Sequence, residues 1–553
     1  MKRREFLSTT LAVAAAGLAP HSARASNGLV EILLDEPIGD IAPELHGHFT
    51  EHIGGVVYNG IWVGEDSKIP NVGGIRKALV DRMRQLHAPV IRWPGGCFAD
   101  SYNWRDGVGP RAQRPVRTNF WDNTTQLCNA PAGPQKYDPN TFGTAEFMRF
   151  CRLCGAQPYV AANVRSLTPH DFDEWVEYCN SPAGSTTLAR TRAADGSPEP
   201  YNVLYWGIGN ENWGCGGDFR PEEYAVEFRR FTSWVPEYGL KMRFIGSGPG
   251  AGERDPQVSW TRGFMENLVA KSPRLLDRLY GFSMHYYCGT TGKGDSLEFS
   301  ADEWYQMLWQ ADVMDSLVTQ HWLAMGDYDK ERKVKLLVDE WGAWHRTTPL
   351  GPAYLFSYVP SLRDALVTAI TLDIFNRHAE KLAMCNDAQL VNNINTLFLA
   401  VEDRFVATTI FHVFDMYKSH QGGRSLRMVC DAPEISFSVG PNGVRPAGGA
   451  AAEREGKSLW GLAGSASRHG NTLVVTIVNP HASESRVADV SLRGGEAKSA
   501  QVTVLTAPDI HAHNDFDHPE AVIPKTEPAG VSGSRFTWTF KPASVTKLEI
   551  ELL

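Results

Sequence analysis

Short apolar runs alternate with longer amphipathic segments between about residues 46 and 420. The apolar runs read HGHFTEHIGG, APVIRWPGG, AQPYVAANV, NVLYWGIGNEN, MRFIGSGPG, YGFSMHYYC, VKLLVDEWG and KLAMCNDAQL. The segments between them, such as IRKALVDRMRQLH and PEEYAVEFRRFTSWVPEY, carry apolar residues at helical spacing. A strand followed by a helix, eight times over, predicts an α/β fold of the (β/α)8 TIM-barrel type.

The pattern changes after about residue 422. NTLVVTIVNP, ADVSLRGG, AKSAQVTVL, SRFTWTF and SVTKLEIELL alternate apolar and polar residues, with Gly, Pro and Asn between them. This alternation predicts a C-terminal antiparallel β-sandwich domain. The stretch GLVEILLDEPIGDIA, which precedes the barrel pattern, has the same character. We therefore expect it to join the sandwich.

The first 25 residues have the features of a leader peptide. MKRREFLSTTLAVAAAGLAP is basic at its start and then apolar, and ARA supplies a cleavage site of small residues. The pair Arg3 and Arg4 resembles a twin-arginine export signal. The apolar run is too short to span a bilayer stably, so we expect no membrane anchor and a periplasmic or secreted product. The predicted organisation is a twin-arginine signal peptide at 1–25, a strand segment of the sandwich at 26–45, the catalytic barrel at 46–422 and the sandwich at 423–553.

Composition and cysteine spacing exclude several classes of function. The formal net charge of −9 gives no electrostatic footprint for nucleic acid. Cys151 and Cys154 form a C-x-x-C without a second pair, so buried structural thiols are favoured over a zinc site. The cluster HAHNDFDH at 511–518 contains metal-binding residue types, but a polar loop between strands is the favoured interpretation. We therefore expect no bound metal.

Three strand ends carry a glutamate beside other polar groups: Glu51, Glu211 and Glu340. A single strand-end glutamate is more often a structural ion pair. Two of them on the fourth and seventh strands of one barrel would meet at its mouth, which is what glycoside hydrolysis requires: one carboxylic acid and one nucleophile or base. Repulsion between the two ionised carboxylates would raise the pKa of one of them.

The motifs, taken in order, resemble those of glycoside hydrolase family 51, the α-L-arabinofuranosidases. The resemblance is carried by IRWPGGCFADSYNWRDGVGPRAQRP, WGIGNENWGCGG, FSMHYY, LLVDEWGAW and DAQLVNNIN. It implies a retaining, double-displacement mechanism in which Glu211 is the acid/base and Glu340 is the nucleophile. The implied substrate-binding residues are Glu51, Arg92, Cys97, Asn210, His285, Tyr287 and Gln389.

Cys97 departs from the pattern of some members of the family, which have Asn at this position as a sugar ligand. A thiol forms weaker hydrogen bonds than an amide does. We interpret Cys97 as the mark of a subgroup, which affects fine specificity and leaves the reaction unchanged.

The expected activity is release of non-reducing terminal α-L-arabinofuranosyl residues from arabinan, arabinoxylan or their oligosaccharides. We expect it to need no cofactor. The resemblance also implies homo-oligomers, often hexamers. Two alternatives stay open: an endo-β-1,4-glucanase or β-xylosidase of the same family, and a non-catalytic carbohydrate-binding protein on a degenerate barrel. A metal-dependent barrel hydrolase would need His or Asp ligands that the strand ends do not supply.

Overall fold

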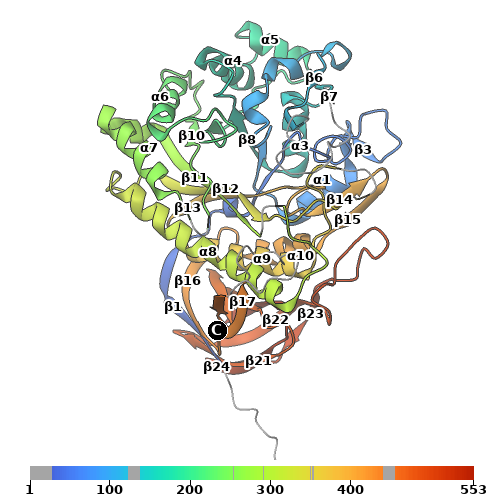
Figure 1. Ribbon diagram of the computed structural model, residues 1–553, viewed down its shortest axis with the longest axis vertical. Coiled ribbons are helices and arrows are strands. Elements are labelled where there is room, and N and C mark those ends of the chain that lie inside the picture. The colour runs from blue at the N-terminus through green and yellow to red at the C-terminus, as the bar shows by residue number, and fades with distance from the viewer. Residues whose placement is uncertain are drawn as a thin grey trace, which may run out of the picture.

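The computed structural model contains a closed parallel barrel and a curved sheet, separated by a layer of helices (Figure 1). The structure describes residues 28–121, 137–252, 255–289, 292–348, 350, 354–439 and 455–553. The predicted signal peptide lies outside these residues.

Eight parallel strands close the barrel; each pairs with the barrel strands before and after it in the chain, and the last pairs with the first. They are β2 (Gly47–Phe49), β5 (Val90–Trp93), β8 (Gln157–Ala162), β9 (Tyr205–Ile208), β10 (Arg243–Gly246), β11 (Leu279–Cys288), β12 (Lys335–Ala343) and β13 (Leu382–Asp387). Their residues are mostly apolar and buried because helices or barrel interior cover both faces. All eight apolar runs of the sequence supply a strand, so the predicted barrel is confirmed.

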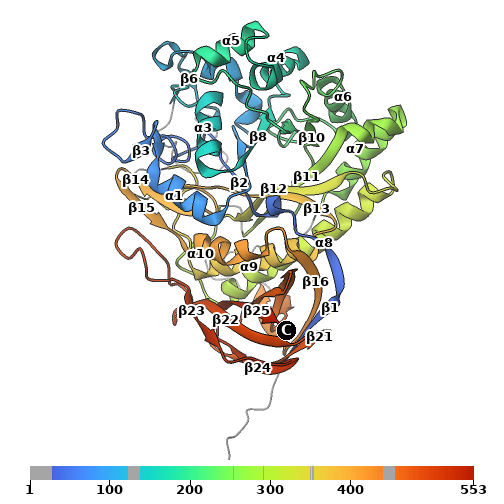
Figure 2. The same cartoon turned by 180° about the vertical axis from the view of Figure 1, so that it is seen from behind.

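Helices surround the barrel strands (Figure 2). They include α1 (Lys77–Leu86), α3 (Thr144–Cys154), α4 (Pro169–Asn180), α5 (Thr187–Ala194), α6 (Pro221–Phe231), α7 (Val258–Lys271), α8 (Ala301–Gly326), α9 (Leu362–Arg377) and α10 (Thr409–Tyr417). Several start at capping residues; Ser300, for example, accepts a hydrogen bond from the Glu303 amide before α8. Short antiparallel strand pairs lie outside the barrel sheet: β3 (Asn71–Val72) with β4 (Ile75–Arg76), β6 (Arg117–Thr118) with β7 (Tyr137–Asp138), and β14 (Phe398–Val401) with β15 (Arg404–Ala407).

The second domain is a nine-stranded sheet in the order β23-β22-β25-β20-β19-β16-β1-β21-β24. Its strands are β1 (Gly28–Asp40), β16 (Arg424–Asp431), β19 (Ala463–His469), β20 (Thr472–Asn479), β21 (Arg486–Arg493), β22 (Ala497–Thr506), β23 (Lys525–Ala529), β24 (Arg535–Phe540) and β25 (Ser544–Leu552), beside the pair β17 (Ile435–Val439) and β18 (Glu455–Leu459). Strands from both ends of the sheet share one apolar core, so the sheet folds over itself as a sandwich. The N-terminal strand β1 pairs antiparallel with β16 and parallel with β21, inside this sheet.

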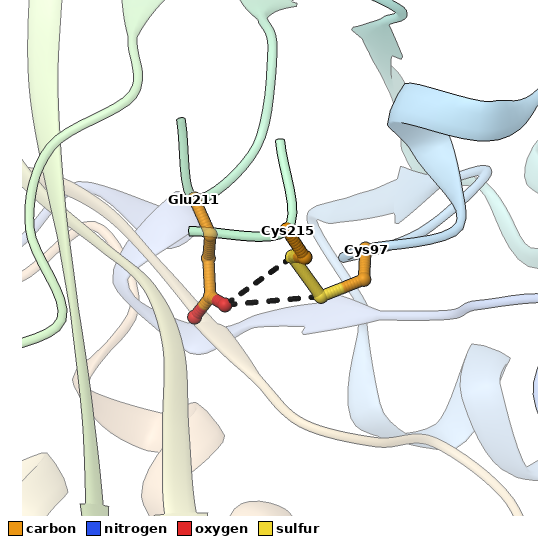
Figure 3. Close-up of side chains that lie close together, drawn as sticks. All are labelled: Cys97, Glu211 and Cys215. Atoms are coloured by element: carbon orange, nitrogen blue, oxygen red, sulfur yellow. Dashed lines mark hydrogen bonds between the residues drawn. A yellow bond between two sulfur atoms is a disulfide. The ribbon is translucent and has the colours of Figure 1, made fainter. Parts of the chain in front are cut away.

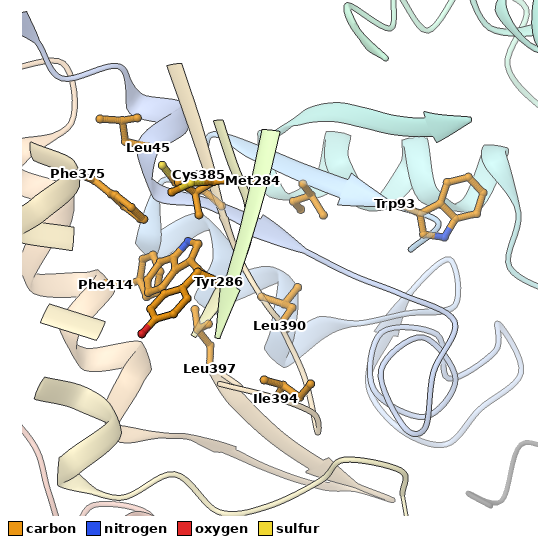
Figure 4. Packing of buried hydrophobic residues seen from close by; sticks show 14 of the residues in the cluster. Leu45, Trp93, Met284, Tyr286, Phe375, Cys385, Leu390, Ile394, Leu397 and Phe414 are labelled. Carbon is orange, nitrogen blue, oxygen red and sulfur yellow. The ribbon is translucent and has the colours of Figure 1, made fainter. Parts of the chain in front are cut away.

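Helices α8, α9 and α10 lie between the barrel and the sandwich (Figures 1 and 2). Helix α9 is buried along almost its whole length because it contacts barrel strands on one side and sandwich strands on the other. Trp341 of β12 packs against Phe375 of α9, with ring centroids 5.3 Å apart, and against Phe414 of α10. Figure 4 shows these two phenylalanines beside the barrel strands. Strand β12, which carries Glu340, is thus anchored against the helix layer.

A buried carboxylate links α9 to the sandwich. Asp373 accepts hydrogen bonds from the hydroxyls of Ser465 on β19 and Thr476 on β20, and from Tyr417 of α10 at 2.8 Å. Burial raises the pKa of Asp373 to about 7 despite these bonds. The hydroxyl donors therefore offset only part of the cost of burying the charge.

We expect Asp373→Asn to flatten the pH dependence of thermal stability. An unfolded aspartate loses its proton near pH ~4, whereas folded Asp373 keeps it to about pH 7. The folded state binds more protons in this window, so the stability from this group is full below pH ~4 and falls as the pH rises to about 7. Asparagine stays neutral, so the variant should unfold a few degrees higher than wild type at pH 8.

The measurement is the apparent midpoint of thermal unfolding between pH 5 and pH 8. Asp415→Asn is the matched control because Asp415 lies on α10 but is partly exposed and pairs with Lys418. If the unfolding midpoint of Asp373→Asn changed with pH as steeply as that of wild type, the prediction would be contradicted.

Candidate functional site

The barrel brings the predicted site residues to the carboxyl ends of its strands. Glu51 follows β2, Arg92 lies on β5, Asn210 and Glu211 follow β9, and Gln389 follows β13. His285 and Tyr287 lie on β11, and Glu340 lies on β12. In a (β/α)8 barrel this end carries the active site. The side chains contact one another there.

Glu211 and Glu340 approach each other across His285. The Nδ1 atom of His285 lies 2.9 Å from Glu211 Oε1 and 3.5 Å from Glu340 Oε2. A carboxylate oxygen of each glutamate and a ring nitrogen of His285 all lie within 4.8 Å of one another. Burial would lower the pKa of His285, but Glu340 and Glu211 together raise it. The imidazole therefore favours its charged form between two carboxylates.

Cationic and hydroxyl donors surround Glu340. Arg92 donates to Oε1 at 2.9 Å and Tyr287 donates to Oε2 at 2.8 Å. Burial alone would raise the pKa of Glu340, but His285, Arg92 and Tyr287 together hold it below its usual range. Arg92 also donates to the side-chain oxygen of Asn210. Glu340 is thereby kept ionised at neutral pH with its oxygens oriented.

Glu51 is the third glutamate of the site. It accepts hydrogen bonds from the Phe98 amide at 2.9 Å, the Trp121 indole at 3.1 Å and the Gln389 amide at 3.0 Å. Burial, and then repulsion from Glu340, raise the pKa of Glu51 to about 8. Its neighbour Gly96 cannot carry a side chain, because a Cβ atom would lie 2.8 Å from Glu51 and 3.2 Å from Glu340.

The loop that carries Glu211 is held by a disulfide that the sequence did not predict. Glu211 has φ +42°, a left-handed conformation that is unfavourable for a glutamate. Cys215 of the same loop is bonded to Cys97, and their sulfur atoms lie 3.6 and 3.8 Å from Glu211 Oε2 (Figure 3). The prediction of Cys97 as a thiol is therefore wrong. The sulfur lies at the site but carries no hydrogen to donate.

Asp100 fixes the same loop from the opposite side. Its buried carboxylate accepts backbone hydrogen bonds from Val164 at 2.7 Å, Arg165 at 3.0 Å and Asn210 at 2.8 Å. These bonds join the loops after β5, β8 and β9. Burial raises the pKa of Asp100 to about 7 even though the three N–H groups oppose the shift. Its position three residues after Cys97, in the motif CFAD, is the one sequence signal that could have indicated this role.

We expect Asp100→Asn to reduce kcat by about 10- to 100-fold, because one amide N–H would face a backbone N–H and displace Asn210 and Glu211. The loss of kcat/KM should be larger for substrates with poor leaving groups, because proton delivery to them depends on the position of Glu211. The measurement compares kcat/KM for good and poor leaving groups. Asp106→Asn is the control because Asp106 pairs with an exposed Arg117. Equal loss for both leaving groups would argue for a general structural effect.

Four tryptophans near the strand ends differ in their burial. Trp341 is fully buried and belongs to the core. Trp344 and Trp121 are partly buried at the mouth, where each contacts Phe356, and Trp213 is 38% exposed beside Glu211. The last three can present a ring to a ligand.

The two sequence motifs considered for metal binding lie away from the strand ends. Cys151 and Cys154 are unpaired and buried on α3, where burial raises the pKa of each thiol. The loop 511–518 packs on the barrel, where Leu362 at the start of α9 donates to the carbonyl of Ala512. Its histidines contact neighbouring aspartates and carbonyls within the loop and on the barrel.

Comparison with known proteins gives consistent results along the chain. Residues 82–267 match a family profile described as the α-L-arabinofuranosidase 1 domain, and residues 339–544 match one described as the α-L-arabinofuranosidase C-terminal domain. A Bacteroides ovatus protein named intracellular exo-α-L-arabinofuranosidase is 32% identical over 530 residues, which cover 95% of each chain.

Solved structures agree with these matches. The family 51 arabinofuranosidase of Xanthomonas axonopodis pv. citri superposes with a TM-score of 0.84 at 34% identity, covering 95% of this chain and 100% of that one. An α-L-arabinofuranosidase from Thermotoga maritima, solved with arabinose, superposes with a TM-score of 0.79 at 26% identity over the same shares.

The prediction of an exported protein is contradicted by these findings. The Bacteroides ovatus relative, which aligns over nearly the whole chain, is itself named intracellular. A compositional leader pattern is weaker than such a full-length match, because short basic and apolar stretches also occur without an export role. In the part of the chain that the structure describes, the helices fall short of the length or apolarity needed to cross a membrane.

Proposed function

The chain belongs to the α-L-arabinofuranosidases of glycoside hydrolase family 51, and from this membership we propose that Glu340 is its nucleophile and Glu211 its acid/base. The enzyme releases non-reducing terminal α-L-arabinofuranosyl residues with retention of configuration. The glucanase or xylosidase alternative and the non-catalytic alternative are not favoured, because the full-length relatives are arabinofuranosidases.

The observation that carries the assignment is the short distance between the two carboxylates. Oxygens of Glu211 and Glu340 lie within 4.8 Å of each other. Retaining glycosidases place their two carboxyl groups about 5–5.5 Å apart, whereas inverting enzymes leave about 6.5–9.5 Å for a water molecule. The arrangement therefore supports attack by a carboxylate rather than by water in the first step.

In the first step an oxygen of Glu340 attacks the anomeric carbon as the bond to the leaving oxygen breaks. Glu211 gives its proton to that oxygen. In the second step Glu211, now ionised, takes a proton from water, and the resulting hydroxyl displaces Glu340. Both enzyme carboxyls return to their starting states, so no metal or cofactor takes part in this proposal.

The remaining residues would bind the sugar ring. Glu51 and Gln389 form a hydrogen-bonded pair that can receive ring hydroxyls. Asn210, held by Arg92, can bind the 2-hydroxyl, a contact that strengthens in the oxocarbenium-like transition state. We place Tyr287 and His285 as the partners that orient the two catalytic carboxylates, and Cys97 as part of the wall beside Glu211.

A cavity lined by Trp213, two residues after Glu211, supports a saccharide leaving group. It has a volume of about 290 Å³ and is lined by Trp213, Phe219, Arg220, Gln257, Trp260 and their neighbours. Because Glu211 protonates the leaving oxygen, the leaving group lies on the side of Glu211. Aromatic rings with polar groups between them suit the faces and hydroxyls of sugars.

We expect Trp213→Ala to lower kcat/KM for arabinoxylan or arabinan oligosaccharides by about 10-fold and to change it little for a nitrophenyl arabinofuranoside. The kinetic ratio of the two substrates is the measurement. Trp234→Ala, at a tryptophan that is 93% exposed elsewhere on the barrel, should leave the ratio unchanged. An equal loss on both substrates would contradict a leaving-group role.

The reaction itself is tested with nitrophenyl glycosides of α-L-arabinofuranose, β-D-xylose, β-D-glucose and cellobiose. Selective hydrolysis of the arabinofuranoside, with initial release of the same anomer seen by NMR, supports the proposal. Turnover of only the xylo- or gluco-substrates would assign the chain to the alternative activity.

Three further properties are proposals. We take residues 46–422 as the catalytic unit and residues 26–45 with 423–553 as the sandwich unit. The natural substrate is an arabinose-containing polysaccharide or its oligosaccharides. Resemblance to the family supports a homo-oligomer, with a hexamer expected, which analytical ultracentrifugation of the full chain can test.

A further inference from the structure

The disulfide and Glu211 place three metal-binding residue types around one point. Cys97, Cys215 and Glu211 each offer a ligand atom, and the three atoms lie within 4.8 Å of one another. All three residues are partly exposed at the site. The unpaired cysteines of the described chain do not form such a group. While the two sulfurs are bonded to each other, neither is a thiolate and neither can bind a cation strongly.

Reduction changes this chemistry. A dithiol reductant transfers two electrons and two protons to the bond between Cys97 and Cys215, giving two thiols, and is itself oxidised to a disulfide. The sulfurs are then no longer bonded and move apart to a non-bonded distance. Reducing compartments favour this state of a protein.

The distances already match part of a tetrahedral zinc site. With Zn–S bonds of about 2.3 Å and a Zn–O bond of about 2.0–2.2 Å, neighbouring ligands are about 3.5 Å (S to O) and about 3.8 Å (S to S) apart. The sulfurs of Cys215 and Cys97 lie 3.6 and 3.8 Å from Glu211 Oε2. Only the distance between the two sulfurs must increase, and reduction allows this because it breaks the bond that holds them together.

We propose that the reduced protein binds one Zn²⁺, or another thiophilic divalent cation, through Cys97 Sγ, Cys215 Sγ and Glu211 Oε2. Each thiol releases its proton to solvent on binding, and water fills the fourth position. His285 lies 2.9 Å from the other oxygen of Glu211 and orients the carboxylate as an outer partner does in metal sites.

Metal binding in the reduced state stops hydrolysis. The cation holds the carboxylate that must give and take the proton, and it occupies the space beside the leaving oxygen. The inhibition rests on the proposed role of Glu211, whereas the binding does not. The site thus couples the redox state of one disulfide to the metal sensitivity of the enzyme.

The experiment compares oxidised and phosphine-reduced full-length protein after removal of the reductant, with Cd²⁺ as a spectroscopic probe and Zn²⁺ as an inhibitor. We expect a thiolate-to-cadmium charge-transfer band at one equivalent per chain in the reduced form only. Zn²⁺ should bind the reduced form at least about 100-fold more tightly than the oxidised form. It should abolish hydrolysis of the nitrophenyl arabinofuranoside, and a chelator should restore it.

Three variants distinguish this site from metal binding elsewhere in the protein. Reduced Cys215→Ser should lose the band, and reduced Glu211→Gln should keep it with weaker binding, by about 10-fold. Cys430→Ser, at an unpaired cysteine of the sandwich, is the control and should behave as wild type.

Equal binding to both redox forms, or a band that persists in Cys215→Ser, would overturn the proposal. So would a disulfide that stays closed in excess phosphine by thiol counting. Zinc inhibition without a band would assign the inhibition to Glu211, His285 and Glu340 instead. Activity of the oxidised, metal-free protein is measured separately, so failure of the proposed function is recognised independently.

Discussion

Glu340→Gln lowers kcat/KM for a nitrophenyl α-L-arabinofuranoside by about 10⁴-fold or more, the expected loss when a covalent nucleophile is removed. The neutral amide keeps the size of the side chain and can still accept from Tyr287, but it cannot form the glycosyl ester. Arg92 and His285 lower the pKa of Glu340 by stabilising its negative charge. In the variant they surround a neutral group and have no such charge to stabilise. The loss corresponds to about 5.5 kcal/mol or more in the activation barrier.

The measurement is steady-state kinetics together with mass spectrometry of the intact protein after a short exposure to a slow substrate. Wild type should accumulate one arabinosyl adduct, and Glu340→Gln should accumulate none. Glu331→Gln is the control because Glu331 is 76% exposed just before the same strand. Residual activity above about 1%, or an adduct on another residue, would remove Glu340 from the role of nucleophile.

The barrel and its two central carboxylates could be predicted because both follow from local patterns. An apolar run buried on both faces identifies a parallel strand, and the first polar residues after it lie at the carboxyl edge. Strands β9, β11 and β12 are neighbours or near neighbours in chain order, so Glu211, His285 and Glu340 had to meet once the barrel closed. The side-chain roles came from resemblance to the family, since spacing alone gives no role.

The contacts that hold the loop of Glu211 could not be predicted in the same way. The bond between Cys97 and Cys215 joins residues 118 positions apart, and it depends on the conformations of two loops that lack a periodic pattern. Asp100 binds three backbone N–H groups, and its place in the motif CFAD does not indicate which backbone groups it binds. The left-handed conformation of Glu211 is likewise fixed by these contacts rather than by residue type.

The sandwich was predicted only where its strands contain large apolar or β-branched residues. Strand β20 has consecutive β-branched residues and was identified, whereas β19 reads AGSASRH and contains no large apolar residue. Strand β19 is buried because it packs beside α9, where Asn376 bonds to Ser465. Small polar residues fit that close contact between helix and sheet, so tertiary packing overrides the weak strand propensity.

Glu211→Ala should affect substrates according to how much their leaving group needs a proton. For a dinitrophenyl arabinofuranoside, whose leaving group departs as a stable anion, we expect kcat/KM to fall by about 10-fold or less. For an arabinan or arabinoxylan oligosaccharide the loss should reach about 10³-fold, within the usual contribution of a general acid. The difference arises because only the sugar alkoxide must be protonated as the bond breaks.

The second half of the reaction provides the discriminating measurement. Without a general base the arabinosyl-enzyme hydrolyses slowly, so azide, which needs no base, should accelerate turnover of the dinitrophenyl substrate and give the arabinofuranosyl azide with retained configuration. In Glu340→Ala, azide would instead attack the substrate directly and give the inverted product. Glu331→Ala, at a residue that is 76% exposed just before β12, should show neither effect. Loss of the acid/base should give an azide product with retained configuration, whereas loss of the nucleophile should give an inverted product. An inverted product from Glu211→Ala would therefore exchange the roles of Glu211 and Glu340.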